Sequence, residues 1–209
     1  MPESMPFQHF TTLEWNPAPM PQSSGAVQLA QLPDLGDGAF RAFVRFPAGW
    51  ERAAHGHYEV AEEFLVLQGA LSFNEHTWQA GAYGWIAARR ARHLLRTEGG
   101  CLVFAWFGGA PRWRRGDPAT PALDADLHHT SWRDAPLQAL PGGGEARQLH
   151  ANPHHSTCII EQPTPAVLAG LPATSELLAL GGYAWCANTA ANIDAWCASP
   201  VLARRRSDP

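Results

Sequence analysis

Two histidines and a glutamate stand at a spacing that suits metal coordination. His55 and His57 are two residues apart, so on a β-strand their imidazole rings would share a face and could converge on one point inside a barrel. Glu62 follows five residues after His57, which is the wrong parity for one continuous strand. A turn must therefore place its carboxylate on the neighbouring strand. Imidazoles and a carboxylate together suit a divalent transition metal.

The segments around these residues indicate short strands. Residues 40–46 alternate, with phenylalanine and small apolar side chains on one face. Residues 63–67 and 101–107 are apolar on both faces, as in strands that are covered on both sides. Gly69 follows the second of these segments and marks a turn in which a side chain would clash. No segment of this region keeps a helical period for ten residues, so the pattern predicts an all-β sandwich or barrel.

The string from Gly49 to Gly69 resembles the first motif of the cupin superfamily in its glycines, its His-x-His pair and its glutamate. Residues 81–93 are similar to the second motif, because a glycine and a short strand precede His93. Arginines and alanines stand there in place of the usual Pro-x-Gly turn, and His93 comes one residue later than is common. The chain looks most like the cupin half of zinc-binding anti-sigma factors and the small RmlC-like cupins grouped with acetylacetone- and dihydroxyacetophenone-cleaving dioxygenases.

This resemblance implies a cupin double-stranded β-helix, or jelly-roll barrel, with four metal ligands: His55, His57, Glu62 and His93. Such a set suits Fe(II), Zn(II) or Mn(II), and also Ni(II) or Cu(II), so one divalent transition metal ion is the expected cofactor. On a five- or six-coordinate metal, four protein ligands leave positions for water, dioxygen or a chelating substrate. No further catalytic residue can be assigned.

Four other residues are candidates for contact with a substrate: Phe64, Val66, Arg89 and Arg90. The two apolar residues share the parity of Glu62 and would line the metal cavity. The two arginines, together with Arg92, precede His93 near the expected mouth of the barrel. Guanidinium groups there could hold a carboxylate or an enolate through bidentate hydrogen bonds. A solvated turn is the alternative interpretation for any one of them.

The chain is expected to have four parts: an extended arm (1–24), the metal-binding cupin barrel (25–112), a linker (113–127) and a degenerate, truncated cupin-like repeat (128–209). Short matches in the same order indicate the repeat, such as EFLVLQG at residues 63–69 against ELLALGG at residues 176–182. The second copy has no His-x-His before its glutamate, so this bicupin would hold a single metal. Two unrelated β-rich halves are the alternative.

Composition argues against several classes of protein. The net charge of −4 disfavours binding to nucleic acid through phosphate neutralisation. The chain has no run of 18 apolar residues that could span a membrane, and no basic start followed by an apolar stretch. We therefore expect a cytoplasmic protein. The four cysteines form no C-x-x-C pair and are interpreted as buried thiols, with a disulfide left open.

Two functions are compatible with these features. One is a metal-dependent enzyme that acts on a small organic molecule, most simply a dioxygenase that cleaves a carbon–carbon bond next to a carbonyl. The other is a non-enzymatic metal-binding sensor or ligand-binding module, as in the anti-sigma relatives. Fold and ligands do not fix the reaction. A homodimer is also expected, because Leu65 and Leu67 would face away from the cavity and need cover from a second sheet, the C-terminal half or another subunit.

Overall fold

The computed structural model describes residues 8–119, 127–140, 143–187 and 196–206. Their strands pair antiparallel, and these residues contain a single α-helix, so the predicted all-β class is confirmed. The chain forms two compact units, which we call the barrel unit (Glu14–Ser131) and the terminal unit (Met1–Leu13 with Trp132–Pro209). Within the described residues, no helix has the length and apolar character that crossing a membrane requires.

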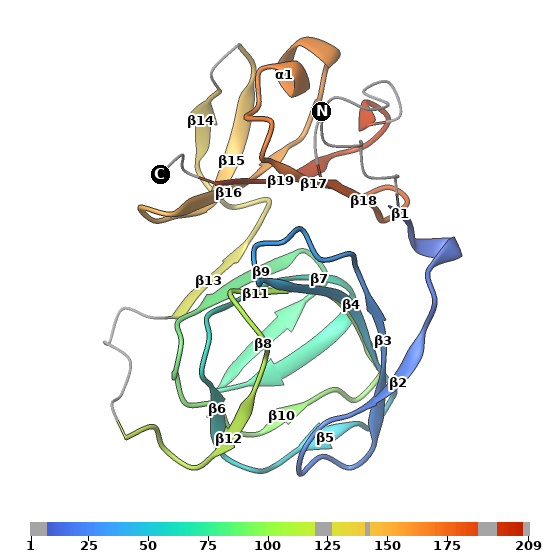
Figure 1. Cartoon of the computed structure of the whole chain (residues 1–209), viewed down its shortest axis with the longest axis vertical. Coiled ribbons are helices and arrows are strands. Elements are labelled where there is room, and N and C mark those ends of the chain that lie inside the picture. The colour runs from blue at the N-terminus through green and yellow to red at the C-terminus, as the bar shows by residue number, and fades with distance from the viewer. Residues whose placement is uncertain (1–7, 120–126, 141–142, 188–195, 207–209) are drawn as a thin grey trace. The chain divides into compact units, whose positions relative to one another are not determined.

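The barrel unit is built on one long antiparallel sheet that curls around a central space (Figure 1). Its strands follow the order β13–β9–β7–β11–β4–β3–β2. Their bounds are β2 (Asn16–Pro19), β3 (Ala26–Gln31), β4 (Phe40–Phe46), β7 (Glu62–Phe73), β9 (Ala82–Ile86), β11 (Cys101–Phe107) and β13 (Leu127–Ser131). Apolar alternation in β4 places Ala42, Val44 and Phe46 in the core, as the sequence predicts.

Shorter strands complete the barrel unit: β5 (Glu51–Arg52), β6 (Gly56–Tyr58), β8 (His76–Gln79), β10 (Leu95–Arg96) and β12 (Trp113–Arg115). They pair as β5 with β10, β6 with β12, and both β8 and β10 with the second half of β7. The strand β7 continues through Gly69 to Phe73, whereas the sequence indicated that it ends at this glycine. Gly69 has a φ of +71°, so it bends the strand without terminating it.

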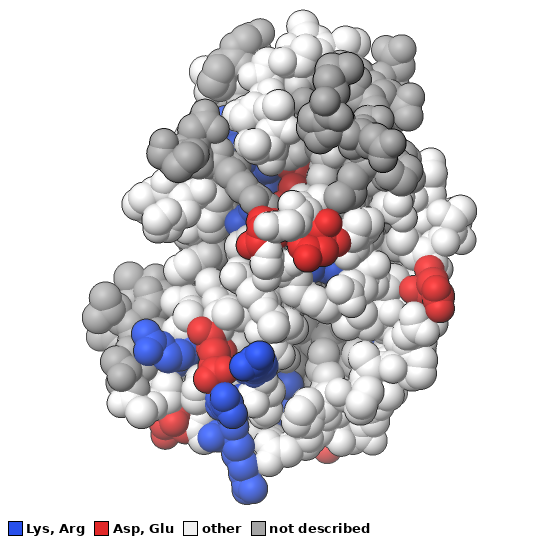
Figure 2. All heavy atoms as spheres, in the orientation of Figure 1, with Lys and Arg blue, Asp and Glu red and all other residues white. Residues whose placement is uncertain are grey.

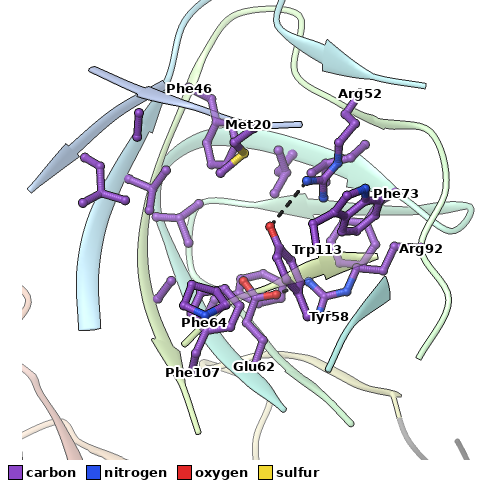
Figure 3. Close-up of a pocket in the computed structure, with 18 of the residues that line it drawn as sticks. Met20, Phe46, Arg52, Tyr58, Glu62, Phe64, Phe73, Arg92, Phe107 and Trp113 are labelled. Carbon is purple, nitrogen blue, oxygen red and sulfur yellow. Dashed lines mark hydrogen bonds and ion pairs between the residues drawn. The ribbon is translucent and has the colours of Figure 1, made fainter. Parts of the chain in front are cut away.

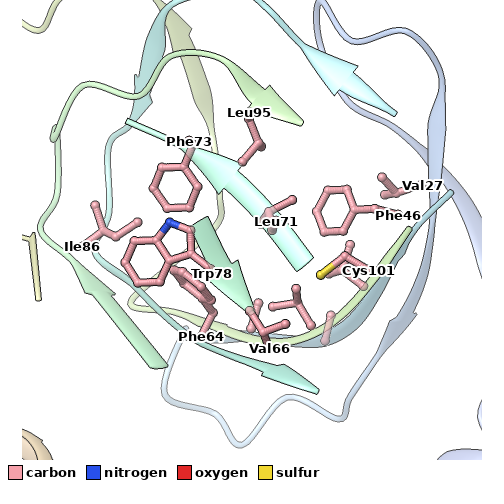
Figure 4. Close-up of a cluster of buried hydrophobic side chains, with 14 of the residues drawn as sticks. Val27, Phe46, Phe64, Val66, Leu71, Phe73, Trp78, Ile86, Leu95 and Cys101 are labelled. Atoms are coloured by element: carbon pink, nitrogen blue, oxygen red, sulfur yellow. The ribbon is translucent and has the colours of Figure 1, made fainter. Parts of the chain in front are cut away.

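Aromatic side chains dominate the core of the barrel unit (Figure 4). Trp78 is fully buried and stacks on Phe73 with ring centroids 5.0 Å apart and an interplanar angle of 10°. Phe64 packs edge-on against Trp78 at 4.9 Å. Gly84 makes room for this cluster, since a Cβ there would lie 2.5 Å from the Phe64 ring. These contacts hold the first half of β7 against β8 and β9. They thereby fix the position of the β7 side chains that point into the barrel.

The terminal unit is a second antiparallel sheet, in the order β1–β18–β17–β19–β16–β15–β14. Its strands are β1 (Gln8–His9), β14 (Leu137–Ala139), β15 (Glu145–Ala151), β16 (His155–Ile160), β17 (Glu176–Ala179), β18 (Ala184–Ala187) and β19 (Val201–Arg206). A 3-10 turn, η1 (Phe10–Thr12), follows β1. The helix α1 (Pro165–Ala169) begins at Thr164, whose side chain accepts a hydrogen bond from the Val167 amide, and it packs into an apolar core of its own.

The two units differ in extent from the parts expected from composition. Strand β2 lies in the predicted arm, yet it pairs with β3 in the barrel unit. Strand β13 lies at the predicted start of the repeat, yet it pairs with β9 in the barrel unit. Pairing along sheet edges sets these boundaries, because each strand must satisfy its backbone hydrogen bonds. That residues 128–209 arose by duplication of the first half stays a prediction.

None of the four cysteines forms a disulfide within the described residues, and Cys101, Cys158 and Cys186 are buried. This removes the disulfide alternative. Burial in the barrel core raises the pKa of the Cys101 thiol to about 12, and burial likewise raises the pKa of Cys158 to about 11. Both side chains act as small apolar core residues, as the sequence indicated.

Candidate ligand site in the barrel unit

The barrel unit encloses a cavity of about 210 Å³ whose walls are mostly apolar (Figure 3). Side chains from β4, β7 and β11 form much of the wall, among them Val44, Phe64, Leu71, Val103 and Phe107. The charged residues that line it are Arg52, Glu62 and Arg92, with Tyr58 and Trp113 beside them. A mainly apolar cavity with a few convergent polar groups is the usual form of a small-molecule site.

Arg52 enters the cavity from β5, which is held by its pairing with β10. The residue is 1% exposed. Its guanidinium carbon lies 3.6 Å above the centroid of the Trp113 ring, and its Nη1 donates a long hydrogen bond of 3.4 Å to the Tyr58 hydroxyl. The Nε and Nη2 atoms are buried and have no hydrogen-bond partner within the described residues.

Arg92 and Glu62 form an ion pair through Nη1 and Oε2, with side chains that are 6% and 13% exposed. Two backbone hydrogen bonds between Arg92 and Gly56 (2.7 and 3.1 Å) hold this arginine next to β6. Its guanidinium carbon lies 4.8 Å from the centroid of the Tyr58 ring. In the part of the chain that the structure describes, the buried Nε and Nη2 atoms of Arg92 also have no hydrogen-bond partner, so Glu62 uses only part of the donor capacity of Arg92.

The predicted histidine ligands lie outside the lining of the cavity. The side chain of His55 is 43% exposed, and its Nε2 is 2.9 Å from Asp117 Oδ1. His57 is buried, and its Nδ1 is 3.0 Å from the Gly116 carbonyl oxygen. Both rings therefore turn toward the segment 116–117. The ring of His93 has its centroid 6.5 Å from that of His55, so these two histidines are near neighbours.

Packing of β6 against β12 explains this orientation. The pairing sets Tyr58 opposite Trp113 and His57 opposite Arg114. The Tyr58 ring packs on Trp113 and on Phe107, with ring centroids 5.2 Å apart in each case. Successive side chains alternate between the two faces of a strand. Because the Tyr58 ring points into the barrel, the His57 ring points out of it. Gly56 allows the approach, since a Cβ there would lie 2.4 Å from the Trp113 ring.

The arrangement does not fit a metal ion held by all four predicted ligands. Of these, Glu62 alone lines the cavity, and there its carboxylate is bound to the guanidinium of Arg92. Nowhere in the described ranges do three histidine, cysteine, aspartate or glutamate side chains group closely enough to hold a metal. A metal centre on these ligands would require Glu62 to leave Arg92 and the imidazoles to turn inward.

Of the four residues predicted to contact a substrate, one lines the cavity. Phe64 lines the cavity, whereas Val66 is buried in the apolar core and is not part of the lining. Arg89 is exposed and Arg90 is half-buried, and neither lines the cavity. Of the three arginines before His93, Arg92 reaches the site.

Sequence reasoning did not find three of the residues at the site, Arg52, Tyr58 and Trp113. One signal was available for Trp113: it stands between Arg112 and Arg114, and such alternation on a strand directs the ring to the side opposite the two charges. The strand that carries Arg52 has two residues, which is too short for any period to indicate a face.

The outer surface of the barrel unit carries mixed charge. Figure 2 shows basic side chains grouped on one part of this unit, with acidic side chains next to them. One exposed ion pair joins Arg114 Nε to Glu59 Oε1 at 3.1 Å. Pairs of this kind contribute at most about 1 kcal/mol, so we assign them no functional role.

Comparison with known families gives one match. Residues 4–110, which make up half of the chain, match the family model described as the ChrR cupin-like domain. Among curated proteins, none matches this chain.

Solved structures share the fold of the whole chain. A candidate dioxygenase from Nostoc punctiforme aligns with a TM-score of 0.71 over 99% of this chain and 84% of its own, at 14% identity. A candidate glyoxylate-induced protein from Pseudomonas aeruginosa aligns with a TM-score of 0.58 over 91% and 83%, at 12% identity. YlbA from E. coli aligns with a TM-score of 0.53 over 96% and 85%, at 10% identity. At such identities the likeness shows the fold alone, and it confirms the predicted β-barrel architecture.

Proposed function

Because the chain belongs to the ChrR cupin-like domain family, we propose that it is a cupin that binds a small organic molecule inside its barrel unit. The observation that supports this proposal is the cavity of about 210 Å³, which combines apolar walls with the polar groups of Arg52, Tyr58, Glu62 and Arg92. Apolar walls bind the body of a ligand, and a few fixed donors orient it. An enzyme and a non-catalytic sensor would both use such a cavity.

A ligand screen with a cavity-filling variant tests this function. Ala105 lines the cavity and is 2% exposed, so Ala105→Leu should fill part of the space at a stability cost of about 1–3 kcal/mol. We expect at least one small organic molecule to raise the melting temperature of the native protein, with about 2.7 kcal/mol of stabilisation at 100 times its Kd. The variant should lose that response.

The exposed residue Ala53 supplies the matched control, since Ala53→Leu adds the same atoms away from the cavity and should leave the response unchanged. Calorimetric titration checks the affinities directly. A ligand that stabilises Ala105→Leu as strongly as the native chain would place binding elsewhere. No response to neutral, anionic or cationic molecules at millimolar concentration would contradict the proposal.

A metal-dependent dioxygenase is the second candidate function. It is favoured by the His-x-His and glutamate string, by the position of Glu62 in the cavity lining, and by the 6.5 Å between the rings of His55 and His93. The Nostoc punctiforme protein that shares the fold is itself described as a candidate dioxygenase. Imidazole and carboxylate ligands would hold a divalent metal that supplies Lewis-acid and oxygen chemistry. The donor atoms would have to rearrange from the positions described above.

Elemental analysis separates the two candidate functions. The dioxygenase candidate predicts about one divalent metal per chain in protein purified without added metal, and loss of this metal in His55→Ala. His76, an exposed histidine outside the predicted set, provides the control, because His76→Ala should retain the metal. A native chain with less than about a tenth of an equivalent of metal would rule against the dioxygenase. That result would leave ligand binding as the function of the cavity.

The burial of Leu65 weakens the argument that a second subunit must cover this residue. Leu65 is 2% exposed within a single chain, so no second subunit is needed to cover it. Homodimerisation, the absence of a nucleic acid partner and a cytoplasmic location stay predictions. Light scattering at micromolar concentration tests the first of them.

A further inference from the structure

Arg52 is a buried cation that pairs with no carboxylate of the described residues. It is 1% exposed. Within the described part of the chain, its guanidinium stacks on the Trp113 ring, lies 5.6 Å from the centroid of the Tyr58 ring, and donates a long hydrogen bond to the Tyr58 hydroxyl. Its Nε and Nη2 atoms have no acceptor among the residues that the structure describes. Burying a charged group without a counter-charge costs several kcal/mol, and each buried donor left unpaired adds to that cost. An anion that pairs with Arg52 would offset this cost.

The charges around the cavity do not balance. Arg52, Arg92 and Glu62 are the charged residues that line it, so two positive charges face one negative charge. Glu62 is already bound to Arg92, which leaves one positive charge uncompensated beside an apolar space. A ligand with a single negative charge would neutralise it, whereas a dianion would bring a second charge into the apolar part.

We propose that this cavity binds an organic monocarboxylate whose carboxylate group pairs with Arg52. The proposal rests on the ligand-binding function above and specifies its ligand class. A carboxylate is planar and accepts two parallel hydrogen bonds from a guanidinium fork. The Nε and Nη2 atoms of Arg52 form such a fork, and they are buried without an acceptor among the described residues. The Tyr58 hydroxyl accepts from the third nitrogen of the same guanidinium, Nη1. Arg92, whose guanidinium lies on the same tyrosine, brings further unpaired donors to this side of the cavity.

The size and lining of the cavity define the rest of the ligand. An apolar cavity of roughly 150 Å³ holds benzene, so about 210 Å³ accommodates a six-membered ring together with a carboxylate. Away from Arg52, side chains such as Phe46, Leu71 and Val103 offer dispersion contacts and no hydrogen-bond partner. The ligand class is therefore an aromatic or branched monocarboxylic acid without polar groups on its body.

Titrations with matched acid and amide pairs test the proposal. The probes are benzoate with benzamide, and isovalerate with isovaleramide, each up to about 10 mM, and binding is followed by calorimetry and by tryptophan fluorescence. We expect at least one acid to bind at least about 30-fold more tightly than its amide, because a charge-assisted bidentate pair is lost. Phthalate should bind more weakly than benzoate.

The same titrations with Arg52→Gln identify the residue responsible. Glutamine retains part of the bulk and removes the charge, so the acid should lose at least about 30-fold in affinity while the amide is little changed. Arg52→Lys should recover part of the acid affinity by restoring the charge. Arg96→Gln removes an exposed arginine from neighbouring β10 and should change nothing. Ligand-free melting curves verify that each variant is folded.

The possible results of these titrations separate the monocarboxylate proposal from the ligand-binding function on which it rests. If amides bind as tightly as acids and Ala105→Leu abolishes both, the cavity binds small molecules and the monocarboxylate class is wrong. If acids are preferred but Arg52→Gln leaves that preference intact, another group holds the carboxylate and the proposal fails. If no probe binds and no molecule of the broader screen does either, both proposals are contradicted.

Discussion

Glu62→Gln is expected to lower the free energy of unfolding by about 3–5 kcal/mol. The substitution keeps the shape of the side chain but removes the carboxylate that pairs with Arg92, in a pair whose side chains are 6% and 13% exposed. The cavity would then contain two buried guanidinium groups, those of Arg52 and Arg92, with no acid beside them. Urea unfolding of the ligand-free protein at neutral pH measures the loss.

Two further variants make this result specific. Glu59 pairs with Arg114 on the surface, so Glu59→Gln should cost less than about 1 kcal/mol. The double variant Glu62→Gln with Arg92→Met removes both charges of the buried pair and should regain much of the stability that Glu62→Gln loses. A Glu62→Gln protein within 1 kcal/mol of the native one would mean that the carboxylate does not neutralise Arg92.

The same substitution separates two roles of Glu62. If this residue balances charge beside an anion site, Glu62→Gln should bind benzoate at least as tightly as the native chain, since the cavity becomes more positive. If it coordinates a metal that holds the ligand, the substitution should weaken binding and lower the metal content together. Both readouts come from the variant already required for the stability measurement.

Gly69→Ala is expected to lower the free energy of unfolding by at least about 3 kcal/mol, or to prevent folding. Gly69 has a φ of +71°, and a Cβ at this position would lie 2.1 Å from the Gly100 carbonyl oxygen. The strained backbone conformation and the overlap with backbone both oppose any side chain, and the obstructing atom cannot rotate away. Soluble yield, circular dichroism and urea unfolding report the effect.

Gly99 is the matched control for this prediction. It lies next to the obstructing residue, has no positive φ, and would place its Cβ at least 4 Å from any neighbouring atom. Gly99→Ala should therefore change the stability by less than about 0.5 kcal/mol. Equal stability of the two variants would show that β7 and β11 do not approach as closely at Gly69 as the structure describes.

Local sequence pattern was sufficient to predict three strands of the barrel sheet. Residues 40–46, 63–67 and 101–107 lie within β4, β7 and β11, and these three strands are adjacent in the sheet. Side-chain alternation is a local property, so it can be read from neighbouring residues. The unit boundaries could not be predicted in this way, because β2 and β13 join the barrel unit through pairing with distant strands.

The positions of the site residues likewise depend partly on local strand geometry and partly on packing against residues far along the chain. The spacing of His55 and His57 predicted that both rings converge inside the barrel, whereas the rings lie beside Asp117 and Gly116. Which side the rings take depends on Tyr58 packing against Trp113, a residue that lies 55 positions further along the chain. No spacing within residues 49–69 carries this information.

The sequence by itself determined an all-β chain and its main strands, because these follow from side-chain pattern and backbone sterics. Tertiary structure alone decided which polar groups the cavity contains. Arg52 stands beside an exposed glutamate in a strand of two residues, and nothing local distinguishes it from a solvated arginine. It becomes a buried cation because Trp113 covers it, and charge burial depends on everything that surrounds a group, not on its neighbours in sequence.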